Sequence, residues 1–272
     1  MYEAYWGLNE KPFQNTPDPK FLYRSEEHEE ALSRLIYAVR ERVGGALLTG
    51  VFGCGKTLLG HALMRELDQE KYKVAFLTNP QMSYVELLMF ITQELGAGGL
   101  PTKKSEVLTN FVFSTLRDIL YRNLKEGKET VIVVDEAHII QEPDVFEGLR
   151  LLLNFQLEDR FLLTLVLLGQ PELRTKVDEY RQFEQRIHIK CHLDNLSEQE
   201  THEYVLHRYK IAGGDQNPFT KAALKAVYSY SGGIPRRINR LCDLSLLSGF
   251  GKQTKTINAE MIQEEIASLG TK

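Results

Sequence analysis

The chain has 272 residues, of which 43% are hydrophobic and 26% are charged, and its formal net charge is −4. This composition is typical of a globular protein with one large and one small domain, and it excludes a fibrous or intrinsically disordered chain. The slightly acidic balance gives no overall attraction to nucleic acid, although a local basic patch can still bind it. Cys54, Cys191 and Cys242 are few and far apart, which argues against a disulfide framework and favours a reducing cytoplasm.

The N-terminal sequence lacks the basic segment and apolar core of a secretory signal peptide. The longest apolar stretch, Phe161–Gly169, has about half the length that a transmembrane helix needs. It suits a central strand instead, and the sequence therefore predicts a cytoplasmic protein.

The first elements alternate between helix and strand. Residues 1–24 contain several aromatic residues and three prolines, and we expect them to form an extended arm over the core. A helix is expected from Ser25 to about Arg42. The apolar run Gly45–Gly50 predicts a buried parallel strand, and the apolar spacing of Thr57–Leu67 predicts a helix.

Between this strand and this helix, Gly50–Thr57 fits the phosphate-loop pattern G-x-x-x-x-G-K-[ST] at every specified position. Free backbone N–H groups in such a loop, with the helix dipole, bind phosphate oxygens. Lys56 adds a positive charge and Thr57 a hydroxyl for Mg²⁺. The alternative is a glycine-rich turn that only caps a helix, which the flanking strand and helix disfavour. The expected nucleotide-binding residues of the loop are Gly50, Val51, Phe52, Gly53, Cys54, Gly55, Lys56, Thr57 and Leu58.

The next segments continue the alternation. Tyr72–Asn79 predicts a strand, and the capping box Ser83–Glu86 opens a helix that is expected to stop at Gly96. Ser105–Glu126 carries its apolar residues on one stripe, which predicts a long amphipathic helix.

A second functional signal follows at residues 130–138. Four β-branched residues after Thr130 predict a buried strand, and two acids follow it directly. Asp135 would hold Mg²⁺, and Glu136 is placed to polarise the attacking water as a general base. The alternative is that both acids begin a solvated loop, which the phosphate loop upstream disfavours. His138 completes the letters D-E-A-H, but the chain is too short for the two-domain helicases that share them, so His138 receives no role.

After the acids, we expect a leucine-rich helix at Val145–Leu157, the strand Phe161–Gly169, and an edge strand at Arg186–Leu193 whose residues alternate strictly. On that strand His188 and His192 would lie about 13 Å apart, too far to bind one metal ion together.

From Asn195 onward the pattern is helical only, with a capping box at Ser197–Glu200 and helix ends expected at Gly213, Gly232, Gly249 and Gly270. The sequence thus predicts an α/β fold with a mostly parallel five-stranded sheet, followed by a small all-α domain. The expected boundaries are 1–24 for the arm, 25–195 for the nucleotide-binding core and 196–272 for the helical domain.

This plan resembles that of AAA+ ATPases, which are P-loop NTPases with a helical lid domain. The resemblance implies that Asn79 restrains the catalytic glutamate and that Gln170 is sensor 1, where the family usually has Asn or Thr. It also implies that Arg186 is an arginine finger which reaches a neighbouring subunit, and that Arg236 is sensor 2. At each arginine the alternative is an ordinary solvated charge. Arg181, Arg237 and Arg240 are weaker candidates.

Five segments look more specifically like the ATPase domain of the general secretion pathway A (ExeA-like) family and related pilus and polysaccharide-export accessory ATPases. They are Tyr5–Phe13, Pro17–Leu22, His28–Ala31, Gly169–Leu173 and Gly233–Asn239. Two local departures are Cys54, where the family often has Thr, and His138, where it often has Gln.

The resemblance implies ATP and Mg²⁺ as cofactors, and a ring or filament of copies in which Arg186 acts in trans. It further implies a secretion or pilus component of the bacterial inner membrane as partner. The protein would lie in the cytoplasm, held peripherally at that membrane by the partner or by a further C-terminal segment. The aromatic residues Phe21 and Tyr23 are candidates to flank the adenine, and packing on the core is their alternative.

The second functional hypothesis is an ATP-dependent DNA-binding regulator of the transposition type, because such regulators share this ATPase plan. Its phosphate contacts would come from basic residues of the helical domain, and it is the less favoured alternative. These residues are Lys221, Lys225, Arg236, Arg237 and Arg240.

Overall fold

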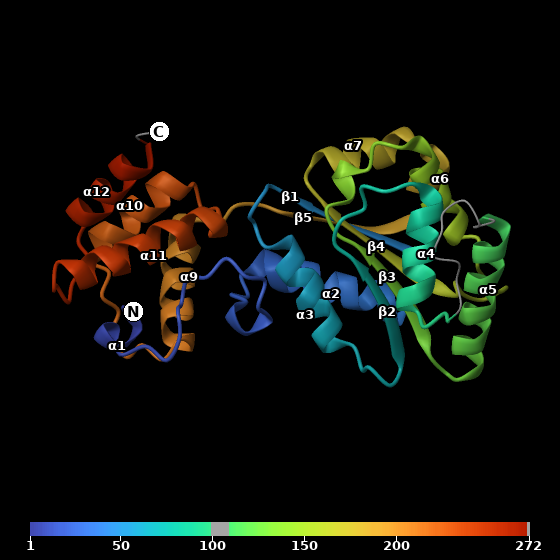
Figure 1. The fold of residues 1–272 in the computed structure, drawn as a ribbon. Helices are drawn as coiled ribbons and strands as arrows, with labels where there is room; N and C mark the ends of the chain where they lie inside the picture. The colour runs from blue at the N-terminus through green and yellow to red at the C-terminus, as the bar shows by residue number, and fades with distance from the viewer. Residues whose placement is uncertain (99–108, 271–272) are drawn as a thin grey trace. The chain divides into compact units, whose positions relative to one another are not determined.

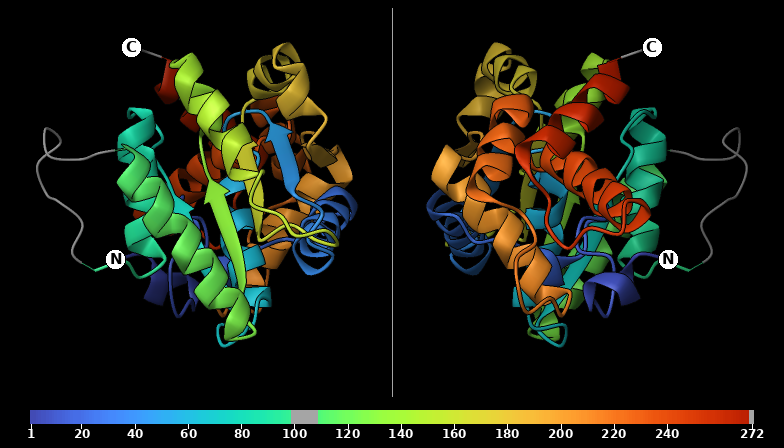
Figure 2. Two further views of the ribbon diagram at one scale, coloured as in Figure 1. Left: turned by 90° about the vertical axis from the view of Figure 1, so that its right-hand side faces the viewer. Right: turned by 90° about the vertical axis from the view of Figure 1, so that its left-hand side faces the viewer.

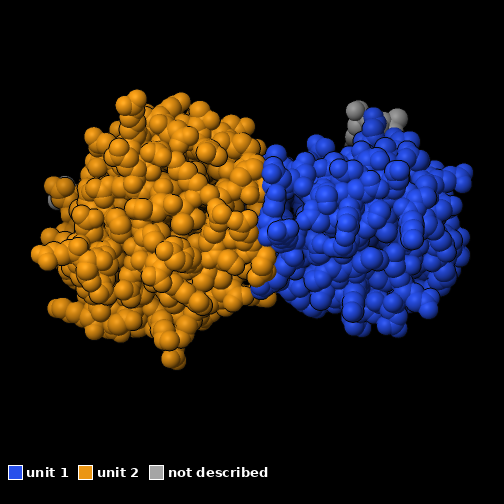
Figure 3. All heavy atoms as spheres, turned by 180° about the vertical axis from the view of Figure 1, so that it is seen from behind, with its two compact units in different colours: residues 1–28, 51–58, 194–272 blue, residues 29–50, 59–193 orange. Residues whose placement is uncertain are grey.

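The computed structural model describes residues 1–98 and 109–270. The chain forms two compact units, which Figure 3 colours separately. The first comprises residues 1–28, 51–58 and 194–272, and the second comprises residues 29–50 and 59–193. The predicted boundaries at residues 24 and 195 stay predictions. Within the described ranges, no helix has both the length and the apolar character needed to span a membrane.

The second unit is built on a five-stranded parallel sheet, which confirms the predicted fold class. The strand order is β2-β3-β4-β1-β5, so the sheet has β5 at one edge, as its alternating sequence predicted. β1, β3 and β4 in the middle are almost entirely buried, because helices cover both faces. The strands are β1 (Gly45–Gly50), β2 (Tyr72–Leu77), β3 (Glu129–Val134), β4 (Leu163–Gly169) and β5 (Ile187–Leu193).

Helices lie on both sides of this sheet (Figures 1 and 2). One face carries a large apolar cluster shared with α4, α5, α6 and α7. On the other face α3 comes so close that a Cβ at Gly60 would lie 2.8 Å from the Leu168 side chain. The bounds are α2 (Glu26–Arg40), α3 (Lys56–Glu66), α4 (Tyr84–Glu94), α5 (Thr109–Lys125), η3 (Ala137–Ile139), α6 (Pro143–Leu152), α7 (Glu172–Glu179) and α8 (Arg181–Glu184).

The observed elements differ from the expected ones mainly at their ends. The capping box at Ser83 is confirmed, since Glu86 accepts hydrogen bonds from the Ser83 N–H (2.8 Å) and hydroxyl (2.6 Å). The expected helix at Ser105–Glu126 is present as α5, and its first four residues lie outside the described ones. α6 ends five residues early, because the chain turns back there and the Leu157 N–H bonds Arg160 O (2.7 Å).

The first unit is helical and includes the N-terminal arm. The arm is not wholly extended: it contains two short helices, and its aromatic residues belong to the core of this unit. Trp6, for example, donates a hydrogen bond from Nε1 to Leu246 O (2.9 Å). The helices are α1 (Glu3–Trp6), η1 (Pro19–Phe21), α9 (Glu198–Ile211), α10 (Lys221–Ser231), α11 (Pro235–Gly251) and α12 (Ala259–Gly270).

Gly249 does not end a helix, as its sequence context suggested, but lies inside α11. A Cβ there would come within 2.7 Å of both Trp6 and Ile257. The glycine therefore allows a close approach of the arm to the helix, and the expected helix end at this position was wrong.

A buried arginine on α9 fixes the arm. Arg208 is 3% exposed and donates hydrogen bonds to Pro12 O (2.6 Å), Gln14 O (3.0 Å) and the Tyr204 hydroxyl (2.9 Å). Its guanidinium also lies over the ring of Phe21, 4.8 Å from the centroid. Since a buried unpaired carbonyl is costly, this side chain makes the burial of the arm at Pro12 and Phe13 possible.

We predict that Arg208→Met lowers the free energy of unfolding by about 2–4 kcal/mol, because two arm carbonyls lose their donor. Urea unfolding measures the change. Lys210→Met is the matched control on the exposed side of the same helix, and it should change stability by less than about 0.5 kcal/mol. Equal effects of the two variants would contradict this account of the arm.

Candidate active site

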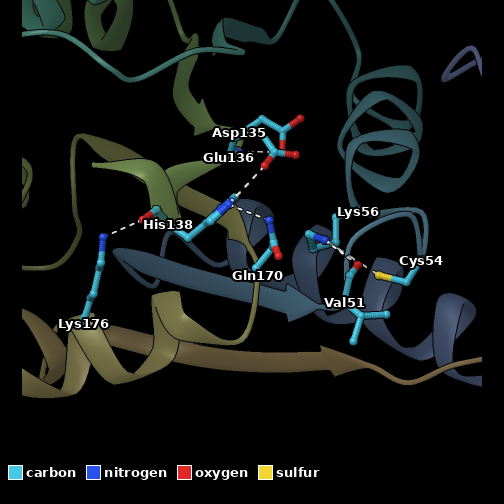
Figure 4. Close-up of polar contacts among 8 residues, drawn as sticks. All are labelled: Val51, Cys54, Lys56, Asp135, Glu136, His138, Gln170 and Lys176. Atoms are coloured by element: carbon cyan, nitrogen blue, oxygen red, sulfur yellow. Dashed lines mark hydrogen bonds and ion pairs between the residues drawn. The ribbon is translucent and has the colours of Figure 1, made fainter. Parts of the chain in front are cut away.

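The phosphate loop joins β1 to α3. Gly50 is the last residue of β1 and Lys56 the first of α3, so the N-terminus of the helix follows the loop directly, as predicted. Gly53 and Gly55 have φ angles of 87° and 112°, a region that disfavours side chains. Lys56 is 5% exposed and donates from Nζ to Val51 O (2.9 Å) within the loop (Figure 4). The loop thus already holds its lysine in a defined position.

Arg236, at the start of α11, contacts the loop within the first unit. Its backbone N–H donates to Gly53 O (3.3 Å), and a Cβ at Gly53 would lie 2.7 Å from the Arg236 Cβ. The guanidinium lies over the exposed ring of Phe52, 4.5 Å from the centroid. An aromatic residue of the loop therefore holds the cation that resemblance assigns to sensor 2.

His28 supports the loop, a role that the sequence did not indicate beyond a family-like pattern. The ring is 5% exposed; Nε2 lies 3.1 Å from Cys54 O and Nδ1 lies 2.7 Å from the Ser25 hydroxyl. A carbonyl only accepts, so Nε2 carries the proton and Nδ1 accepts from Ser25. Burial lowers the pKa of His28 below its ordinary value, and burial raises the pKa of the Cys54 thiol. Both groups are therefore neutral beside the loop at physiological pH.

In the second unit, polar residues gather at the carboxyl edge of the sheet. β3, β4 and β1 are neighbours, and their register pairs Val134 with Leu167 and Thr49 with Gly169. Asp135 and Gln170 each follow the end of their strand at this edge, where Gly50 ends β1. Asp135 is 2% exposed, and its Oδ1 accepts from the Glu136 N–H (2.8 Å). This edge is where ligands bind in open parallel sheets.

Glu136, His138 and Gln170 form one polar cluster, visible in Figure 4. The His138 Nε2 lies 2.8 Å from the Gln170 Nε2 and 3.5 Å from the Glu136 Oε2. Glu136 has a left-handed backbone with φ of 52°, unusual for a residue with a side chain. Lys176 donates from Nζ to His138 O (2.5 Å) and fixes the turn. The structure thus brings together the predicted acid and the predicted sensor, with a histidine between them.

Two predicted site residues do not join this cluster. β2 ends at Leu77 rather than Asn79, and the exposed Asn79 side chain accepts a hydrogen bond from the Gln81 N–H (3.2 Å). Arg186 precedes β5 and so lies at the amino edge of the sheet, a strand length of roughly 20 Å from the carboxyl edge. It donates from Nη1 to Leu153 O (2.7 Å) at the C-terminus of α6.

The side chains suit Mg²⁺ in their chemistry. Thr57 offers a hydroxyl and Asp135 a carboxylate, and Mg²⁺ prefers oxygen ligands. In residues 1–98 and 109–270 no group of three or more His, Cys, Asp or Glu could hold a metal ion. Mg²⁺ in nucleotide sites uses one or two protein oxygens together with phosphates, so two such ligands are sufficient.

A small cavity borders the loop inside the first unit. It is lined by Tyr23 of the arm, Cys54 of the loop, and Leu196 and Pro235 of the helical segment, among others. Its volume of about 20 Å³ would hold one water molecule. Of the two arm aromatics, Tyr23 lines this cavity, whereas Phe21 is buried in the core under Arg208.

Comparison with known proteins identifies the family. A family model described as an AAA domain matches residues 39–177, about half of the chain. The chain is also 41% identical to General secretion pathway protein A of Aeromonas hydrophila over 260 residues, covering 94% of this chain and 46% of that protein. It therefore spans about half the length of that relative.

Solved structures agree on the fold. The ORC2 protein of Aeropyrum pernix, in ADPNP and ADP complexes, has a TM-score of 0.67 at 16% identity, over 89% of this chain and 67% of that one. The ORC1 protein of the same organism, in complex with DNA, has a TM-score of 0.70 at 16% identity, over 89% and 65%. The chain therefore belongs to the AAA domain family.

Proposed function

We propose that the chain binds ATP with Mg²⁺ at the Gly50–Thr57 loop, hydrolyses it through Glu136, and uses the cycle to control its own oligomerisation. The process it serves is the assembly of bacterial secretion or pilus machinery of the envelope. The observation that carries the catalytic part is the cluster of Glu136 and Gln170 at the sheet edge where β1 enters the loop.

Glu136 acts as the general base in this proposal. Its carboxylate accepts the proton of the attacking water, while Gln170 contacts the γ-phosphate. Lys56 and the loop N–H groups stabilise the charge that spreads over the phosphate oxygens. Thr57 and Asp135 would hold Mg²⁺, which neutralises phosphate charge when it is bound. The adenine packs beside Tyr23, after the small cavity there has widened.

Arg186 acts across a subunit interface in this proposal. In its own chain it lies at the edge of the sheet opposite Glu136 and Gln170, so it cannot stabilise the transition state there. A neighbouring copy can receive it, and an arginine supplied in this way is worth about 10³–10⁵ in rate. Its hydrogen bond to Leu153 O would then be exchanged for phosphate contacts. Arg236 acts as sensor 2 in this proposal, after its guanidinium has left the ring of Phe52.

The cellular role rests on the similarity to General secretion pathway protein A. That name supports a place in secretion, with a component of the inner membrane as partner and a site of action at its cytoplasmic face. Hydrolysis would change the oligomeric state and thereby the affinity for this partner.

A second candidate function is ATP-dependent DNA binding, and two observations favour it. The basic residues on α10 and α11 that could contact phosphates are exposed, and a structural neighbour is described in complex with DNA. Binding of long duplex DNA that requires ATP and weakens steeply with salt would favour this function. Absence of such binding at low salt would exclude it.

Glu136→Gln should abolish turnover, with kcat lowered by about 10²–10⁴, because the amide cannot accept the water proton. ATP affinity should stay within about threefold of the wild type, since the phosphate contacts remain. Steady-state ATPase assays and titration with a fluorescent ATP analogue measure the two quantities. Lys56→Ala is the contrasting variant and should lose ATP affinity. Unchanged turnover of Glu136→Gln would refute the catalytic assignment.

A mixing experiment tests Arg186 in trans. Arg186→Ala and Glu136→Gln should each be nearly inactive alone, with losses of about 10² or more. Mixed together they should regain turnover, because some interfaces then combine an intact Glu136 with an intact Arg186 of the neighbour. In the control, the variant that carries both Arg186→Ala and Glu136→Gln is mixed with Glu136→Gln. This mixture should stay inactive, because neither component has an intact Glu136. If the turnover of the mixture is only the mean of the turnovers of its two components, Arg186 does not act across an interface.

His28 should make the stability of the protein depend on pH. Its folded-state pKa is lowered, so the unfolded state binds more protons as the pH falls below about 6.5. The associated stability is present above that pH and is lost as the pH falls toward the folded-state pKa. Urea unfolding at pH 7.5 and 5.5 should show a smaller loss for His28→Gln than for the wild type. The exposed His188→Gln should retain the wild-type loss, and equal losses in all three proteins would contradict the prediction.

A further inference from the structure

The ring nitrogen Nε2 of His138 faces two different site residues. It lies 2.8 Å from the amide nitrogen of Gln170 and 3.5 Å from a carboxylate oxygen of Glu136 (Figure 4). Gln170 follows β4 and Glu136 follows β3, so this histidine connects the ends of two neighbouring strands. The proposed reaction uses both of these residues and does not use His138.

The Nε2 atom cannot accept a hydrogen bond from the Gln170 N–H and donate one to the Glu136 carboxylate at the same time. A carboxylate only accepts, so a bond to Glu136 requires a proton on Nε2. The amide N–H of Gln170 only donates, so a bond to it requires a lone pair on Nε2. If the Gln170 amide turns over, its oxygen faces the ring instead and accepts from the protonated nitrogen. The orientation of the Gln170 amide therefore decides which tautomer of His138 faces Glu136.

The surroundings hold the ring in this place. Lys176 donates hydrogen bonds to His138 O (2.5 Å) and Ile140 O (2.7 Å), which fixes the backbone on both sides of Ile139. A Cβ at Gly169 would lie 3.2 Å from the His138 N, so β4 passes close beneath the turn. The Nδ1 atom is buried and has no hydrogen-bond partner among the residues that the structure describes. Nε2 is therefore the atom through which this ring interacts with the site.

We infer that His138 is a positioning residue that transmits the state of Gln170 to Glu136. Phosphate oxygens only accept, so a bound γ-phosphate draws the amide N–H groups of Gln170 and leaves its oxygen toward His138. The ring then gives its Nδ1 proton to water and takes one at Nε2, so its charge does not change, and the Nε2–H is shared between the Gln170 oxygen and the Glu136 carboxylate. Without the phosphate, the Gln170 N–H faces the ring and Glu136 loses this donor. The inference rests on the proposed roles of Glu136 and Gln170, and it adds the residue that couples them.

A double-mutant cycle on kcat tests the coupling, with His138→Ala, Gln170→Ala and the double variant in the full chain. His138→Ala should lower kcat by about tenfold or more at unchanged ATP affinity. Gln170→Ala should lower kcat by a smaller factor in the His138→Ala background than in the wild type, because only its contact with the γ-phosphate is then left to lose. His188→Ala is the control histidine on the exposed edge strand and should leave kcat and ATP affinity unchanged.

His138→Gln separates positioning from mere packing. The terminal amide of Gln lies as many bonds from Cβ as Nε2 does, and it can present either a donor or an acceptor. This variant should keep kcat within about threefold of the wild type. Additive losses in the cycle, or a His138→Gln variant as slow as His138→Ala, would overturn the inference. If Glu136→Gln still abolishes turnover in the same assays, the proposed function stands and only the coupling role falls.

Discussion

The parallel register of β3, β4 and β1 is the constraint on which the site depends. Parallel strands end at the same edge, and helices bury both faces of these three. Apart from Glu129 at the start of β3, they therefore carry only apolar residues, glycines and threonines. The charged and amide side chains of the candidate site therefore follow the strands. Asp135, Gln170 and the phosphate loop each occupy such a position. The order of the strands in the sheet therefore determines which of these residues lie next to one another.

The elements that sequence predicted well are those fixed by local rules. β1 has the predicted bounds, and the capping box at Ser83 fixes the start of α4. β5 was placed at a sheet edge because its residues alternate, which is typical of a strand with one solvated face. Two helix ends were predicted wrongly. α6 ends early because the chain turns back at Leu157, which is a local effect, and Gly249 serves a contact with the distant Trp6 instead of ending a helix.

The candidate site also contains residues that the sequence predicted and contacts that only the structure shows. Motif spacing predicted roles for the loop and the two acids, because each role needs a particular residue type after a strand. Spacing could not reveal His28 under Cys54 or His138 beside Gln170, since these contacts join segments that are far apart in the chain. Nor could it reveal that Arg186 bonds a helix end of its own chain or that Asn79 faces its own turn. Those details depend on packing, which no single segment encodes.

The core of the helical unit joins the two ends of the chain. Tyr2, Trp6 and Phe13 pack with residues of α9 to α12, which follow the whole sheet unit in the sequence. The arm therefore leaves the ribosome long before its partners exist, and its aromatic surface must wait through the synthesis of the entire sheet unit. Because closing so long a loop costs entropy, the helical unit is expected to form last. A nascent chain thus acquires its strands before the helical unit forms, and so before Arg236 can contact Gly53 of the loop.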